Sequence, residues 1–486
     1  MASDLRPLFE PKGVVVTGVS AHPGKFGFVA LHNILACGYT GPVFAVGRAE
    51  GTVLDRPVLA SVDAVPDGAA ELLVLCTPVA ANAEIVRSAA ARGVRAVFCA
   101  AGGYSEAGPE GAEAEDQLVA LADELGVVLA GPNGQGVVST PVGLCAQIVA
   151  PFPTAGRIAV VSQSGNFVSS FLNYANQTGV GISRAVSAGN AAAIGVADYL
   201  EWFADDPETE VALCYLEGLA DGRGFFERVR EVTRRMPVVV VKGGTTAGGQ
   251  RAAASHTGSL ANDDQIFDGM ARQAGLVRAA NIESAFEAAA TFATQPLPAG
   301  NRIVVLSTAG GWGVVTADAV TAHRDLDLTA LPADLMATID NLVPPRWSRN
   351  NPVDLAGGET RDTIPAVLKA TVAHPAVDAV VQLGLGIQGN TAALTRGGPF
   401  HPDHGLGRIV DFHEHQERRY AEAADSASRS HDKPVLVASE LAVARPDNPL
   451  VQAVRESGRL CYPSADRAVV ALGHLVRYAD WRRRRP

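Results

Sequence analysis

Residues 14–27 read Val14-Val-Val-Thr-Gly18-Val-Ser20-Ala-His-Pro23-Gly24-Lys25-Phe-Gly27, an apolar run that ends in a glycine-rich turn. Helical spacing follows over 28–37, so the segment predicts a strand, a turn and a helix in succession. Such a turn presents backbone N–H groups at a helix N-terminus, where pyrophosphate or another anion binds. It is neither a P-loop nor a strict dinucleotide fingerprint, because its glycines are spaced differently and no Ser or Thr follows Lys25. From spacing alone, a nucleotide or CoA site and a plain strand-to-helix turn are equal alternatives.

The alternation of strands and helices continues through the first third of the chain. Further apolar strands are predicted at 42–46, 72–76, 96–100 and 127–130, with helices at 79–92 and 112–125 between them. Strands that are apolar along their whole length are typical of parallel sheets covered by helices on both faces. The sequence therefore predicts an α/β protein built on doubly wound sheets.

Two later segments start the pattern again and resemble each other. They read Arg157-Ile-Ala-Val-Val-Ser-Gln-Ser-Gly165 and Arg302-Ile-Val-Val-Leu-Ser-Thr-Ala-Gly310. Each follows a joint rich in Pro and Gly, which is typical of a domain boundary. We predict three α/β domains, over 1–150, 151–297 and 298–478, of which the second and third share a fold.

One stretch of the third domain, near 388–422, is rich in histidine and does not fit the alternation. His413 and His415 are two residues apart, so on a helix their side chains would diverge. We therefore predict a solvated loop or lid there, and no metal site.

Composition limits the classes of partner. The chain has 486 residues, 47% of them hydrophobic and 19% charged, and a net charge of −11. An acidic surface argues against nucleic acid and anionic membranes as partners. The N-terminus has no signal-peptide pattern, and no apolar run approaches the roughly 20 residues that span a bilayer, so we predict a cytoplasmic protein. The six cysteines form no CxxC pair, which favours buried thiols over a disulfide framework or a zinc site.

A second strand-to-helix turn, Ser162-Gln163-Ser164-Gly165, presents N–H groups and small hydroxyls that suit a bound phosphate. An ordinary Ser or Asn helix cap is the plainer alternative. The GxSxG elbow of a hydrolase nucleophile is absent.

His256 stands among small residues, in Ala252-Ala-Ala-Ser-His-Thr-Gly-Ser-Leu-Ala261. An imidazole can accept a phosphoryl group when another side chain orients the ring. Glu217, which ends the predicted strand 211–216, is a candidate for that orienting carboxylate. The residues alone also allow a purely structural histidine.

Six motifs in this order resemble those of the ADP-forming acyl-CoA synthetases and the related succinyl-CoA ligase α subunit. They are Gly18-x-Ser20…Pro23-Gly24-Lys25-x-Gly27, Gly131-Pro132-Asn133, Ser162-Gln163-Ser164-Gly165, Tyr215-Leu216-Glu217-Gly218, Ser255-His256-Thr257-Gly258 and Asn351-Pro352-Val353-Asp354-Leu355. The resemblance implies a Rossmann-like CoA-binding domain followed by two flavodoxin-like ligase domains. It also implies that His256 carries phosphate, that Glu217 steadies it, and that the turn 162–165 binds phosphate.

The same resemblance implies the ligands and the partner. CoA would contact the first turn, a later strand end and Asn133. The turn contributes Gly18, Ser20, Pro23, Gly24 and Lys25, and the strand end contributes Thr77 and Pro78. A small carboxylic acid or its acyl-CoA would be the substrate. The chain has no room for an ATP-grasp region, so ATP or ADP with Mg²⁺ is expected on a separate ATP-grasp β subunit.

Some positions depart from the family pattern. Gly134-Gln135 stands where Cys-Leu is usual, and Ala45-Val46-Gly47-Arg48 replaces the common Asn-Pro pair after the second strand. Two other functions are alternatives to this one. A CoA-binding sensor or scaffold without turnover is disfavoured by the intact His256 motif. A nicotinamide-dependent oxidoreductase lacks its fingerprint, and Arg48 stands near where an acidic ribose ligand is expected.

Overall fold

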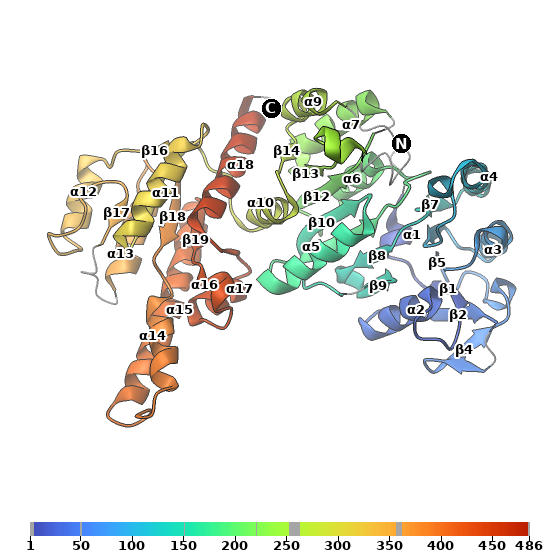
Figure 1. Ribbon diagram of the computed structural model, residues 1–486, viewed down its shortest axis with the longest axis horizontal. Helices are drawn as coiled ribbons and strands as arrows, with labels where there is room; N and C mark the ends of the chain where they lie inside the picture. The colour runs from blue at the N-terminus through green and yellow to red at the C-terminus, as the bar shows by residue number, and fades with distance from the viewer. Residues whose placement is uncertain are drawn as a thin grey trace. The chain divides into compact units, whose positions relative to one another are not determined.

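The computed structural model describes residues 4–48, 51–149, 151–219, 221–251, 263–355 and 362–484. The chain divides into two compact units, Met1–Gln177 with Gly181–Ala285, and Thr178–Val180 with Phe286–Pro486 (Figure 1). The described residues form three sheets that are mostly parallel, two of them with seven strands and one with six. The predicted α/β class is confirmed.

The first sheet has the strand order β3-β4-β2-β1-β5-β6-β7. Its strands are β1 (Val14–Val19), β2 (Val43–Gly47), β3 (Thr52–Val53), β4 (Arg56–Leu59), β5 (Leu72–Leu75), β6 (Ala96–Cys99) and β7 (Val128–Ala130). The helices are α1 (Arg6–Phe9), α2 (Phe26–Ala36), α3 (Val79–Ala91) and α4 (Pro109–Leu125), with short 3-10 turns at Val62–Ala64 and Ser105–Ala107. Alternate residues of each strand face opposite helical layers. Val14 and Val16 pack with α1 and α2, and Val15 packs with α3 and α4.

The second sheet has the order β14-β13-β12-β10-β11-β8-β9. Its strands are β8 (Gly136–Ser139), β9 (Leu144–Gln147), β10 (Ala155–Ser162), β11 (Ile182–Ser187), β12 (Val211–Leu216), β13 (Val238–Lys242) and β14 (Val277–Arg278). The helices are α5 (Gly165–Thr178), α6 (Val196–Asp205), α7 (Gly222–Arg235), α9 (Asp264–Ala274) and α10 (Ile282–Thr294), with a 3-10 turn at Thr140–Val142. The hairpin β8–β9 precedes residue 150, yet β8 pairs antiparallel with β11 of this sheet. The first two sheets therefore meet within one compact unit.

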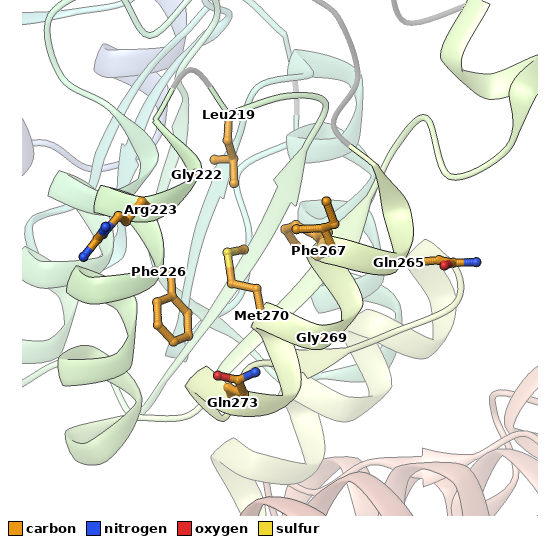
Figure 2. Close-up of a pocket in the computed structure, with 10 residues that line it drawn as sticks. Leu219, Gly222, Arg223, Phe226, Gln265, Phe267, Gly269, Met270 and Gln273 are labelled. Carbon is orange, nitrogen blue, oxygen red and sulfur yellow. The ribbon is translucent and has the colours of Figure 1, made fainter.

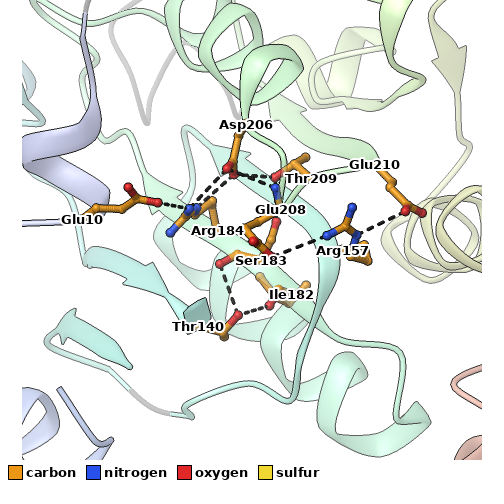
Figure 3. A network of polar contacts seen from close by, with 10 residues as sticks. All are labelled: Glu10, Thr140, Arg157, Ile182, Ser183, Arg184, Asp206, Glu208, Thr209 and Glu210. Carbon is orange, nitrogen blue, oxygen red and sulfur yellow. Dashed lines mark hydrogen bonds and ion pairs between the residues drawn. The ribbon is translucent and has the colours of Figure 1, made fainter. Parts of the chain in front are cut away.

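A buried ion network fastens this meeting (Figure 3). Arg184 of β11 is fully buried, and its Nε lies 3.0 Å from the carboxylate of Asp206. The same guanidinium donates to the hydroxyl of Ser139 on β8 and to the carboxylate of Glu10, which follows α1. A buried guanidinium requires this full set of acceptors, because desolvation without partners costs several kcal/mol. The network thus ties the N-terminal segment to the second sheet.

The second unit is built on a sheet of order β16-β15-β18-β19-β20, with β17 paired to β15. Its strands are β15 (Arg302–Ser307), β16 (Asp327–Leu328), β17 (Val353–Asp354), β18 (Ala379–Leu383), β19 (Val435–Ala438) and β20 (Cys461–Tyr462). The helices are α11 (Gly310–Ala322), α12 (Ala333–Asp340), α13 (Thr363–Ala373), α14 (Ile387–Arg396), α15 (Leu406–His431), α16 (Leu441–Ala444), α17 (Pro449–Glu456) and α18 (Ala465–Arg484).

The two resembling segments fold into the same turn. The Ser162 hydroxyl donates to the Ser164 carbonyl at 2.6 Å and accepts from the Ser164 N–H at 3.1 Å. The Ser307 hydroxyl makes the same two contacts with Ala309, at 2.8 and 3.0 Å. A parallel strand, this serine turn and a helix therefore recur in both sheets, as the sequence similarity indicated.

The His-rich stretch is not a loop, so that prediction is wrong. Two helices, α14 and α15, occupy most of it. Val410, Tyr420 and Ala424 of α15 are buried at helical spacing, two of them in the core of this unit. The many charged residues between them hid this apolar stripe in the sequence. Among the described residues, no helix combines the length and apolar character that crossing a bilayer requires.

Candidate functional site

A cavity of about 630 Å³ opens at the carboxyl ends of β1, β2 and β5. Five of the eight residues proposed for CoA line it: Gly18, Ser20, Lys25, Thr77 and Pro78. Parallel α/β sheets bind ligands at this edge, where backbone N–H groups and helix N-termini converge. The cavity therefore stands where a nucleotide-like ligand is expected.

The glycine turn that shapes this cavity depends on close backbone contacts. Gly18 has φ +70°, and a Cβ there would lie 2.4 Å from the carbonyl oxygen of Cys76. A Cβ on Gly27 would lie 2.4 Å from the Gly18 carbonyl oxygen. Glycine at both positions lets β1, β5 and the start of α2 approach one another. Lys25, at the N-cap of α2, forms no side-chain cap.

Residues that the motifs did not single out also shape the cavity. Arg48, Ser61, Asp63 and Ser88 line it, and the Ser88 hydroxyl donates to Asp63 at 2.5 Å. This hydrogen bond is the main cause that holds the pKa of Asp63 below its usual value. The cavity is thus lined by the positive charge of Arg48 and the negative charge of Asp63, besides the N–H groups of the turn. Only Arg48 had a signal in the sequence, through its place after a predicted strand.

Asn82 holds the strand end beside the cavity in place. Its buried side-chain amide contacts the hydroxyls of Thr77 and Tyr104, at 2.7 and 2.8 Å. A buried amide satisfied on both sides fixes its neighbours, because breaking either hydrogen bond leaves a desolvated polar group. Nothing in its local sequence distinguishes Asn82 from other asparagines on a helix.

Three residues proposed for CoA do not line this cavity. Pro23 and Gly24 lie in the turn, where the Gly24 N–H donates to the His22 ring at 3.0 Å. Asn133 has a left-handed backbone, and its amide donates to Asn190 at 3.2 Å. Asn190 follows β11 of the second sheet, so Asn133 lies where the first two sheets meet.

The second turn lies at the carboxyl end of β10, beside β12. Gln163 links the two strand ends: its side-chain oxygen accepts from the Glu217 N–H at 2.6 Å, and its amide donates to the Gly218 carbonyl at 3.3 Å. The Ser162 hydroxyl is buried and engaged within the turn, while Ser164 directly precedes α5, which begins at Gly165. The structure therefore brings Gln163 and Glu217 together.

Glu217 is almost fully buried, with 8% of its surface exposed. The Lys242 ammonium donates to its backbone carbonyl at 2.9 Å. Burial, the charge of Glu217 and a hydrogen bond between the two side chains together raise the pKa of the neighbouring Tyr215 to about 12. The Tyr215 hydroxyl therefore stays protonated near neutral pH and holds the carboxylate. In the sequence, Tyr215 stands out only as part of the motif Tyr215-Leu216-Glu217-Gly218.

His256 lies outside the described residues. It stands in the connection from β13 to α9, and β13 pairs directly with β12, whose end carries Glu217. That connection leaves the sheet from the same carboxyl edge as Glu217. Among the residues that the structure describes, no three His, Cys, Asp or Glu side chains are grouped to hold a metal ion.

A second pocket, of about 470 Å³, lies between α7 and α9 (Figure 2). Phe226, Phe267 and Met270 give it an apolar lining. The Phe267 ring also lies 6.0 Å from the Lys242 ammonium, at the end of β13. This pocket therefore adjoins the strand ends that carry Glu217 and Lys242.

Comparison with known proteins assigns each sheet to a described domain family. Residues 12–140 match a CoA binding domain, 155–292 a succinyl-CoA ligase like flavodoxin domain, and 303–388 a Ligase-CoA domain.

Similar proteins match between 77% and 99% of the chain. The chain is 33% identical to the acetate–CoA ligase [ADP-forming] I subunit alpha of Pyrococcus furiosus, over 98% of both chains. It is 34% identical to the acetate–CoA ligase [ADP-forming] I of Archaeoglobus fulgidus, over 77% of this chain and 54% of that protein. A solved structure of the dinucleotide forming acetyl-coenzyme A synthetase 1 of Ca. Korarchaeum cryptofilum, in complex with phosphate and ADP, aligns with a TM-score of 0.83. It is 30% identical and covers 99% of this chain and 98% of that one.

Proposed function

The chain belongs to the family of ADP-forming acyl-CoA ligases, and from this premise we propose that it is the α-type subunit of such a ligase. It takes acyl-CoA, phosphate and ADP to a carboxylic acid, CoA and ATP, reversibly, through phospho-His256. The observation that carries the proposal is the meeting of Gln163 and Glu217 at one sheet edge, at 2.6 Å. The chain from β13 to His256 starts at the same edge.

CoA binding is assigned to the cavity of the first sheet. The N–H groups of the turn 18–25 and the start of α2 suit the pyrophosphate, and Lys25 adds a positive charge. Thr77 and Pro78 lie on the opposite strand end, held by Asn82. Pro23, Gly24 and Asn133 complete the proposed set as residues that shape the turn and the domain junction.

The reaction then proceeds in three transfers. An oxygen of inorganic phosphate attacks the thioester carbonyl, and the CoA thiolate leaves with an acyl phosphate formed. An imidazole nitrogen of His256 attacks the phosphorus, and the carboxylate leaves. ADP finally takes the phosphoryl group, which regenerates His256 and gives ATP. The N-terminus of α5 behind Ser162–Gly165 favours the negative charge of the phosphate in each transfer, and Glu217 orients the imidazole.

We assign the nucleotide step to a separate ATP-grasp β subunit that binds ADP with Mg²⁺. The similar Pyrococcus furiosus protein is named a subunit, and this chain covers 98% of it. The chain covers about half, 54%, of the longer Archaeoglobus fulgidus protein, which is not named a subunit. A division of one activity over two chains accounts for both lengths. Domain boundaries at 150 and 297 belong to the same proposal. Nothing in the comparisons favours a CoA-binding sensor without turnover.

The proposal is tested by following phosphate onto the protein. The purified chain is mixed with an ATP-grasp partner, Mg²⁺ and ATP labelled at the γ-phosphate. We expect an acid-labile, base-stable label that is absent in His256→Ala and present in His413→Ala, which removes a histidine from α15 instead. Glu217→Gln should slow labelling without removing it.

The relay would be overturned if phosphate label persisted in His256→Ala. It would also be overturned if the unchanged protein took up no label from a partner subunit that is itself active with ATP. Addition of CoA and a panel of carboxylic acids to the labelled protein should release the label, and the acid that releases it fastest identifies the acyl group.

A further inference from the structure

Two cysteines face each other where α2 of the first domain packs against β9 of the second sheet. On one side of the pair, the Asn33 amide donates to the Gln147 carbonyl at 2.9 Å. On the other side, a Cβ on Gly143 would lie 2.8 Å from the carbonyl carbon of Gly38. These contacts bracket Cys37 and Cys145, so the two segments run past each other in close, fixed register.

The side chains of the two cysteines interact with each other. Cys145 is the main cause that lowers the pKa of Cys37 to about 7, and Cys37 is in turn the main cause that raises the pKa of Cys145. Cys37 is partly exposed, whereas Cys145 is buried, with 1% of its surface exposed. Cys37 therefore combines solvent access with thiolate character, and Cys145 stands behind it as a resolving thiol.

The other thiols of the chain serve as a comparison. Burial raises the pKa of Cys76, Cys214 and Cys461 to about 12, and that of Cys99 to about 11. A thiol with such a pKa is protonated at neutral pH and does not attack disulfides. Cys37 is distinguished from them by its partner and by its place at the end of α2.

We propose that Cys37 and Cys145 form a redox-active dithiol, a modification site for low-molecular-weight disulfides. The Cys37 thiolate attacks the disulfide RSSR, forming a mixed disulfide with Cys37 and releasing one RS⁻. The Cys145 thiol then loses its proton and attacks the Cys37 sulfur, forming the Cys37–Cys145 bond and releasing the second RS⁻. The two protein thiols are oxidised, and RSSR is reduced to two thiols.

The bond connects α2 to the second sheet without blocking the CoA cavity. Cys37 follows the last residue of α2, and the cavity turn precedes the first. The helix has 11 residues, which at about 1.5 Å each places the two ends roughly 16 Å apart. Oxidation therefore cross-links two domains across a closed loop of about one hundred residues, and a long loop favours stabilisation of the folded state. This inference is independent of the proposed acyl-CoA ligase activity.

The test treats the reduced full-length chain with oxidised glutathione at neutral pH. Remaining thiols are then alkylated, and the peptides are measured by mass spectrometry. We expect joint loss of alkylation at Cys37 and Cys145 and a cross-linked peptide pair that dithiothreitol separates. Cys37 should react at least about 100-fold faster than Cys76, as the thiolate fractions imply. The oxidised protein should melt at a higher temperature than the reduced one.

Variants separate the two steps. Cys145→Ser should stop at a stable glutathione adduct on Cys37, and Cys37→Ser should leave Cys145 unmodified. Cys76→Ser is the matched control and should oxidise like the unchanged protein. A stable adduct on Cys37 in the unchanged protein would overturn the inference, as would full alkylation of both thiols after prolonged exposure. If a variant fails to fold, the oxidation and alkylation of the unchanged protein still test the inference.

Discussion

Replacing Gly18 by alanine isolates the close contact that shapes the proposed CoA cavity. Gly18 has φ +70°, and a left-handed backbone costs an alanine about 1–2 kcal/mol. Its Cβ would also lie 2.4 Å from the Cys76 carbonyl oxygen, whereas ordinary contact begins at 3.4 Å. The strand end before Thr77 must therefore move by about 1 Å. A displacement of that size in a binding site costs at least about 1.4 kcal/mol, or tenfold in affinity.

Gly68 provides the matched control for this change. It has the same φ of +70°, and a Cβ there would meet nothing within 4 Å. Gly68→Ala therefore carries the backbone strain without the collision. Both variants should lose a similar amount of stability from strain, but only Gly18→Ala should lose CoA affinity.

The assay is titration calorimetry with CoA, alongside thermal unfolding of each variant. We expect Gly68→Ala to bind CoA within about threefold of the unchanged protein, and Gly18→Ala at least tenfold more weakly. Equal CoA affinities in the two variants would refute the reasoning, because the contact with the Cys76 carbonyl would then have no bearing on the cavity.

Three further perturbations test other parts of the structure. Arg184→Met leaves a buried carboxylate without its cation and should destabilise the first unit by about 3–5 kcal/mol, whereas Glu10→Gln, at a partly exposed partner, should cost about 1 kcal/mol or less. Hydrogen exchange of β11 peptides measures both, and equal effects would contradict the burial argument. Tyr215→Phe removes the hydrogen bond to Glu217, so kcat of the assembled ligase should fall about tenfold while KM for CoA stays unchanged; a change confined to KM would exclude a positioning role. Burial lowers the pKa of His474 to about 4, below the usual 6.5. Its contribution to stability is therefore present above pH 6.5 and lost as the pH falls toward 4, by about 3 kcal/mol in total. Thermal unfolding of His474→Gln across this range should show a shallower loss than the unchanged protein, and parallel curves would contradict the assignment.

The sequence by itself determined the local units of this protein. The apolar run 14–16 and the glycines after it specify a strand, a turn and a helix, because side-chain period and backbone freedom act over a few residues. The same holds for the serine turns after β10 and β15, whose similarity predicted a shared fold. The local pattern marked the turn with Gly18, Ser20 and Lys25, whereas Thr77 and Pro78 were added to it only by the family resemblance. All five line one cavity, because parallel strands end at one edge of a sheet.

The tertiary structure decided what depends on partners distant in the chain. It alone shows that β8 and β9 join the second sheet, and that Arg184 is buried between Glu10 and Asp206. It alone brings Cys37 to Cys145, and it turns the His-rich stretch into two helices. These features rest on long-range packing and desolvation, which no local pattern records. The sequence identified two turns whose N–H groups suit a bound anion, and the packing of distant segments decided which side chains surround them.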